Sequence, residues 1–121
     1  MRNLLLVLGA YHLGLGLLMF LAPGTFFEEF ANYGVQNDHY IRDNATINLA
    51  FGVALFVAAG RPAWRAPVLA VIGLQYAFHV INHAFDIGET DPGWQGPLAV
   101  VSLTLLGALI VWLWRQAEFE R

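Results

Sequence analysis

The chain has 121 residues, of which 58% are hydrophobic and 12% are charged, with a net charge of −3 and no cysteine. Soluble domains carry roughly twice this share of charged residues, so the composition is typical of a membrane protein. The absence of cysteine excludes disulfides, thiol redox chemistry and iron–sulfur clusters. The acidic balance offers no basic surface for nucleic acid.

Four apolar segments predict four transmembrane helices, at about 3–21, 40–59, 66–85 and 97–114. Each segment has 18 to 20 residues, and a bilayer core about 30 Å thick is spanned by about 20 helical residues. Four apolar helices in so short a chain could not shield one another's apolar surface from water. The sequence therefore predicts an all-α fold, a four-transmembrane-helix bundle that forms a single membrane domain over residues 1–121.

The first apolar segment follows Arg2 and has two interpretations. A secretory signal peptide would have a shorter apolar run and a cleavage site of small residues, so we expect a retained helix. Gly9, His12 and Gly16 share one face of it, which predicts a close contact with a neighbouring helix. The same glycines could also serve self-association into a homo-oligomer.

The stretch PGTFFEEFANYG follows, and it predicts a short interfacial helix between the first and second spanning helices. Thr25 and Glu28 have the spacing of a capping box at its start. Asp38 is the predicted N-cap of the second spanning helix. In that helix, Asn44 and Asn48 lie on one face and are expected to point into the bundle.

A polar stripe marks the end of the third spanning helix, in the stretch QYAFHVINHAFD from residue 75 to residue 86. At the helical step, five polar side chains fall within an arc of about 100°, and the opposite face is wholly apolar. These five residues are Gln75, His79, Asn82, His83 and Asp86. A membrane helix of this kind turns its polar face toward the interior of a bundle.

The arginines predict the orientation in the membrane. Both termini and the connection between the second and third helices share one side, which holds Arg2, Arg61, Arg65, Arg115 and Arg121. The other side holds only Arg42. By the positive-inside rule, both termini are cytoplasmic, and we expect the protein in a bacterial inner (plasma) membrane.

Depth in the membrane predicts that the polar residues meet. At a rise of about 1.5 Å per residue, His12 is level with Gln75, and Asn48 is level with His79. Asn44, Asn82 and His83 fall at the next level toward the outside. The predicted site is one outward-opening cluster of eight residues: His12, Asn44, Asn48, Gln75, His79, Asn82, His83 and Asp86.

One interpretation of this cluster is a metal site. His79 and His83, at i and i+4, project side by side as two ligands would, and Asp86 and His12 are candidates for the others. Imidazole and carboxylate suit a divalent transition metal, while His12 and His79 on facing helices would suit a haem. The protein would then be a metal- or haem-assisted membrane oxidoreductase or related enzyme with His79, His83 and Asp86 as catalytic residues.

A metal-free interpretation uses the histidines and Asp86 as acid–base groups. The amides of Asn44, Asn48, Gln75 and Asn82 would hold the polar head of a quinone or a lipid. The protein would then be a non-enzymatic quinone- or lipid-binding subunit of a larger membrane complex. A third interpretation is purely structural, with each polar contact between helices contributing about 0.6 kcal/mol.

Three features of the chain are similar to a known group. They are the aromatic segment PGTFFEEF, the arginine-led opening RDNATINLAFG of the second spanning helix, and the Arg/Pro turn before the third. In these features the whole chain resembles the small four-helix membrane proteins grouped around the DoxX family. The resemblance implies the four-helix fold and, as in some members of that group, a role beside membrane oxidoreductases that deal with quinone.

Overall fold

The computed structural model describes residues 1–119, and over that range the chain forms five α-helices. The long helices are α1 (Arg2–Leu21), α3 (Asp38–Gly60), α4 (Pro62–Phe85) and α5 (Gln95–Phe119), and the short helix α2 (Pro23–Phe30) follows α1. The long helices have 20 to 25 residues and are apolar enough to cross a membrane. The predicted all-α bundle of four spanning helices and one short helix is confirmed. Arg121, which entered the orientation argument, lies outside the described residues.

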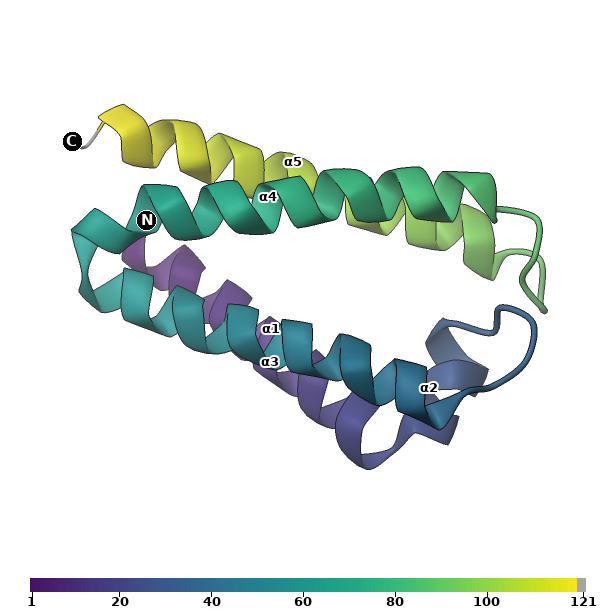
Figure 1. The fold of residues 1–121 in the computed structure, drawn as a ribbon. Coiled ribbons are helices and arrows are strands. Elements are labelled where there is room, and N and C mark those ends of the chain that lie inside the picture. Colours follow the sequence, from purple (N-terminus) through teal and green to yellow (C-terminus); the bar gives the residue numbers. More distant parts are fainter. Residues whose placement is uncertain (120–121) are drawn as a thin grey trace.

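The long helices form two antiparallel pairs, with α1 packed on α3 and α4 packed on α5 (Figure 1). The pairs converge at the end that holds the start of α1, the end of α5 and the turn between α3 and α4 (Figure 1). They diverge toward the other end, where α2 and the connections 31–37 and 86–94 lie (Figure 1). We call the end where the helix pairs converge the closed end and the end where they diverge the open end.

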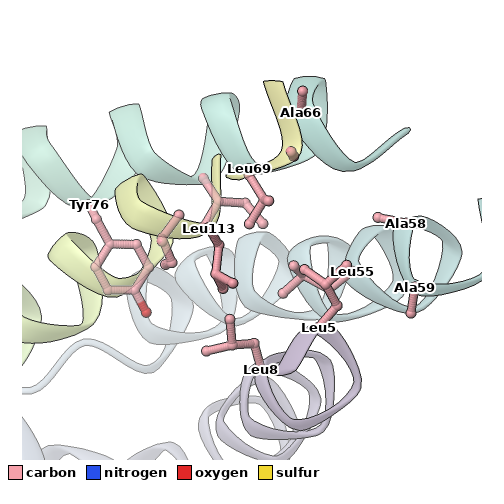
Figure 2. Close-up of a cluster of buried hydrophobic side chains, with 12 residues drawn as sticks. Leu5, Leu8, Leu55, Ala58, Ala59, Ala66, Leu69, Tyr76 and Leu113 are labelled. Atoms are coloured by element: carbon pink, nitrogen blue, oxygen red, sulfur yellow. The ribbon is translucent and has the colours of Figure 1, made fainter. Parts of the chain in front are cut away.

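The hydrophobic core holds the closed end together. Its buried members are Leu5, Leu8, Leu55, Ala58, Ala59, Ala66, Leu69, Ile72, Tyr76, Ile110, Leu113 and Ala117. Figure 2 shows Leu5 and Leu55 meeting between α1 and α3, with Leu69 and Leu113 directed toward them from α4 and α5. Because this core draws on all four long helices, it fixes the two pairs against each other.

Prolines begin two of the helices earlier than the sequence predicted. α4 begins at Pro62, whereas the predicted start was residue 66, and Arg61 is extended (φ −132°, ψ 96°) as a residue before proline favours. α2 begins at Pro23 without a side-chain cap, so the predicted capping box of Thr25 and Glu28 is wrong. In both cases the fixed φ of proline suits the first helical position. α5 extends to Phe119, five residues beyond the predicted end at 114.

The N-cap of α3 is Asn37, so the prediction of Asp38 is wrong by one residue. The Asn37 side-chain oxygen accepts hydrogen bonds from the amides of His39 (3.1 Å) and Tyr40 (3.2 Å). Asp38 is the first helical residue, where the helix dipole still favours its negative charge.

Glycines let α1 and α3 approach closely, as the sequence predicted for Gly9 and Gly16. A Cβ atom at Gly16 would lie 2.8 Å from Leu49 Cγ and 3.0 Å from the Leu49 amide nitrogen. A Cβ atom at Gly52 would lie 3.0 Å from the carbonyl oxygen of Gly9. The glycine face of α1 is therefore used inside the bundle.

We expect Gly16→Val to lower the free energy of unfolding by about 1–3 kcal/mol, because the added side chain forces α1 away from α3. Gly14→Val is the matched control, since a Cβ atom there would meet nothing within 4 Å. Equilibrium unfolding in mixed detergent micelles measures both variants. Equal losses in the two variants would contradict the close contact between α1 and α3.

Candidate functional site

A cavity of about 800 Å³ lies between the diverging helix pairs, and all five helices contribute to its wall. This volume is within the range of small-molecule binding sites. The structure brings seven of the eight predicted site residues to this one cavity: Asn44, Asn48, Gln75, His79, Asn82, His83 and Asp86. The eighth, His12, is not among the lining residues.

Three residues of the polar stripe form a hydrogen-bonded row along α4. Gln75 Nε2 is 3.1 Å from His79 Nδ1, and His79 Nε2 is 2.8 Å from His83 Nε2. The spacing of four residues places these side chains one above the other on the same helix face. The i, i+4 pair that suggested two metal ligands is therefore a pair of rings bonded to each other.

Tyr33 extends this row to the open end of the fold. Its hydroxyl is 2.7 Å from His83 Nδ1, and the rings meet edge to face with centroids 5.1 Å apart. Partial burial raises the pKa of the Tyr33 hydroxyl above its ordinary value, and the nearby Asp86 carboxylate raises this pKa further. Tyr33 therefore stays protonated and remains able to donate a hydrogen bond.

The connections 31–37 and 86–94 are joined across the open end by a set of contacts that we name the outer clasp. Its members are Asn32, Tyr33, Thr90, Asp91 and Gln95. Tyr33 and Thr90 form an isolated antiparallel bridge, and the Asp91 amide donates to the Asn32 carbonyl oxygen at 3.2 Å. The clasp therefore joins the connection between α2 and α3 to the connection between α4 and α5.

Gln95 is the central side chain of the outer clasp. It is 5% exposed, and its amide oxygen accepts from the Asn32 amide at 3.2 Å. Its Nε2 donates to the carbonyl oxygens of Glu28 and Glu29 at the end of α2, both at 3.3 Å. One buried side chain thus joins the first turn of α5 to α2, and these bonds satisfy carbonyls that a helix end leaves free.

His12 forms a separate polar contact deeper in the bundle. It is 1% exposed, and its Nδ1 is 3.0 Å from Asn48 Oδ1. Since that oxygen only accepts, Nδ1 carries the proton, and Nε2 faces the Tyr76 hydroxyl at 3.5 Å. This hydrogen bond joins α1 to α3, and Asn48 connects it to the wall of the cavity.

The predicted metal-ligating residues do not come together as one set. Within residues 1–119, no three side chains of His, Asp or Glu are grouped so that they could hold a metal ion. The His12 ring also packs edge-on against Phe51 and Tyr76, at centroid distances of 5.7 and 5.8 Å. In this arrangement His12 bonds Asn48, and His79 and His83 bond each other, so the metal and haem interpretations stay predictions.

Tyr33, Thr90 and Gln95 are site residues that sequence reasoning missed. Tyr33 stood in the stretch predicted to form the short interfacial helix, and Gln95 lies two residues before the predicted start of the fourth spanning helix at 97. The one local signal is Gly34, whose positive φ of 64° turns the chain directly after Tyr33.

Fold and cavity together define a class, that of small all-α proteins with four membrane-spanning helices and a polar cavity between two helix pairs. Comparison with protein families, with curated proteins and with solved structures finds no match to this chain.

Proposed function

We propose that this protein binds a neutral amphipathic molecule with carbonyl or hydroxyl groups, of the quinone type, in the cavity between the helix pairs. The observation that carries the proposal is that the cavity wall has a polar part and a largely apolar part, contributed by different helices. All asparagine and histidine side chains that line it come from α3 and α4. The wall from α1, α2 and α5 is largely apolar, with Leu15, Met19, Phe26, Phe30, Leu98 and Leu103.

Such a wall suits a ligand with a polar head and an apolar body. Amide and imidazole groups donate hydrogen bonds to carbonyl oxygens and accept them from hydroxyls. Lining residues such as Phe51 and Leu103 supply the apolar contact that small-molecule sites use for most of their surface.

The charges around the cavity favour a neutral ligand. Among residues 1–119 no arginine lines it, and the chain has no lysine. The acidic lining residues, Glu29 and Asp86, lie at the end of α2 and just after α4. An anionic head would leave its charge unpaired in the bundle, at a large cost in free energy.

This proposal takes up the quinone- or lipid-binding interpretation in preference to the metal- or haem-assisted enzyme. The preference follows from the hydrogen bonds of His12, His79 and His83, which all go to protein groups. Among residues 1–119, no third His, Asp or Glu is grouped with two of these side chains as a metal site would need. The same proposal includes the resemblance to DoxX-like proteins and the orientation with cytoplasmic termini. It also includes a location in a bacterial inner membrane and docking in a larger complex or homo-oligomer. With cytoplasmic termini, the cavity lies toward the outer leaflet.

Tryptophan fluorescence tests the binding site directly, because Trp94 lines the cavity. In a variant that keeps Trp94 and has phenylalanine at positions 64, 112 and 114, we expect menadione to quench the fluorescence saturably. The matched control keeps only Trp64, which lies outside this cavity and lines an apolar groove formed by α3 and α4. Quenching of the control should rise linearly with quinone, as collisions in the membrane require.

Two results would overturn the proposal. One is linear quenching of equal slope for Trp94 and Trp64. The other is a Soret band or near-stoichiometric metal in protein purified without chelators, provided that the His79→Ala/His83→Ala variant loses it. The second result would restore the metal- or haem-assisted enzyme.

A further inference from the structure

Four side chains that line the cavity form an unbroken hydrogen-bonded row that ends at the outer clasp. The row runs from Gln75 through His79 and His83 to Tyr33, with links of 3.1, 2.8 and 2.7 Å. Gln75 lies in the membrane-spanning part of α4, and Tyr33 lies in the connection between α2 and α3. The row therefore joins the interior of the bundle to its surface.

The row can exist with two opposite directions of donation. In one direction Gln75 Nε2 donates to His79, His79 Nε2–H donates to His83, and His83 Nδ1–H donates to the Tyr33 oxygen. In the other, Tyr33 donates inward and the His79 Nδ1–H ends on the Gln75 amide oxygen. The Gln75 amide supports both directions because it carries a donor, Nε2, and an acceptor, Oε1. Rotation of the amide group exchanges their positions.

We infer that this row is a proton relay between the ligand cavity and water at the outer clasp. A ligand hydroxyl that displaces Gln75 gives its proton to His79 Nδ1, and His79 passes its Nε2 proton to His83. His83 passes its Nδ1 proton to the Tyr33 oxygen, whose own proton goes to water. Each ring gains one proton and loses one, no electron moves through the row, and the row ends in the opposite direction of donation. The ligand stays neutral because, for each proton that enters the row, a quinol (QH2 → Q + 2 H+ + 2 e−) gives one electron to an oxidised one-electron carrier of a partner protein.

The inference deepens the proposed function and rests on it for the identity of the group that gives or takes the proton. It narrows the ligand to one whose oxygen atoms change protonation, as those of a quinone and its quinol do. A lipid ester carbonyl has no proton to exchange. Imidazole is the side chain best suited to such a relay, because one nitrogen can accept while the other donates.

The charges that face the row lie at its outer end. The other titratable residues that line the cavity are Tyr11 of α1, Glu29 of α2, Tyr40 of α3, and Tyr76 and Asp86 on and directly after α4. The described part of α5 adds none. The Asp86 carboxylate is exposed at the surface beside Tyr33, where it attracts a proton that leaves the row.

Nitrogen-15 spectroscopy of labelled histidine tests the relay in the ligand-free protein. We expect a mixture of Nδ1–H and Nε2–H forms at both His79 and His83, and a nitrogen–nitrogen coupling across their shared hydrogen bond. Tyr33→Phe should slow exchange of the His79 ring proton with water by about 100-fold, which is the lower end of what a positioned proton-transfer group contributes. The ring proton of His12, which does not line the cavity and belongs to no part of the row, is the internal control and should exchange at an unchanged rate.

A single fixed tautomer at each ring in the wild-type protein would overturn the relay, and this measurement needs no variant. An unchanged exchange rate in Tyr33→Phe would also overturn it, provided that the His12 signal shows an intact fold. Failure of the relay and failure of the proposed function are separable. Saturable quenching of Trp94 with fixed tautomers rejects the relay alone, and mobile tautomers without quenching reject the quinone-type ligand alone.

Discussion

Replacing Gly96 with alanine should open the outer clasp and lower the free energy of unfolding by about 3 kcal/mol. A Cβ atom at this position would overlap the carbonyl oxygen of Ile87 and lie 2.9 Å from the carbonyl carbon. Because both atoms belong to the backbone, no side-chain rotation relieves the contact. The start of α5 would have to move away from the 86–94 connection.

That movement would break further bonds of the clasp. The Gly96 amide donates to Thr90 Oγ1 at 3.0 Å, and the preceding Gln95 holds the end of α2. Buried polar groups that lose their partners cost about 1–3 kcal/mol each. The steric overlap and the lost hydrogen bonds therefore act in the same direction.

Gly93→Ala is the matched control for this prediction. It lies in the same connection, and a Cβ atom there would meet nothing within 4 Å. Equilibrium unfolding in micelles and proteolysis of the 86–94 connection should separate the two variants. A loss of stability in Gly93→Ala as large as that in Gly96→Ala would show that the connection tolerates no substitution, and that the Ile87 contact is not the cause.

The parts of this fold that the sequence predicted are those that follow from periodicity along one helix. Hydropathy located four spanning helices because a bilayer imposes the same length on each. The stripe from Gln75 to Asp86 predicted cavity residues because residues three or four apart share a helix face. Gly9 and Gly16 predicted a close contact with a neighbouring helix for the same reason, and the structure shows that this helix is α3.

The parts that the sequence did not predict depend on contacts between distant segments. Tyr33 and His83 are 50 positions apart, and Asn32 and Gln95 are 63 apart. No repeat in the sequence connects such pairs. The predicted depth in the membrane put His12 level with Gln75. Depth alone does not determine which neighbouring side chain a residue contacts. In the structure the His12 ring nitrogens face Asn48 of α3 and Tyr76 of α4, and His79 and His83 bond each other.

The last prediction uses this separation of the histidines. We expect His79→Leu/His83→Leu to weaken menadione binding about 10–100-fold, the equivalent of a lost hydrogen bond of about 1–3 kcal/mol. The stability of this variant should stay the same or rise. The two rings hydrogen-bond to each other, to Gln75 and to Tyr33, which is partly exposed. Leucine has a more favourable free energy in a membrane-spanning helix than a polar side chain.

His12→Leu should do the opposite and lower stability by about 1–3 kcal/mol with little effect on binding. Its ring is 1% exposed, and its removal leaves the Asn48 oxygen without the donor on Nδ1. Trp94 quenching and equilibrium unfolding measure both variants side by side. If the α4 histidines only hold helices together, the double variant will lose stability as His12→Leu does and will bind menadione unchanged. Opposite responses in the two variants would instead separate a binding site at His79 and His83 from a structural contact at His12.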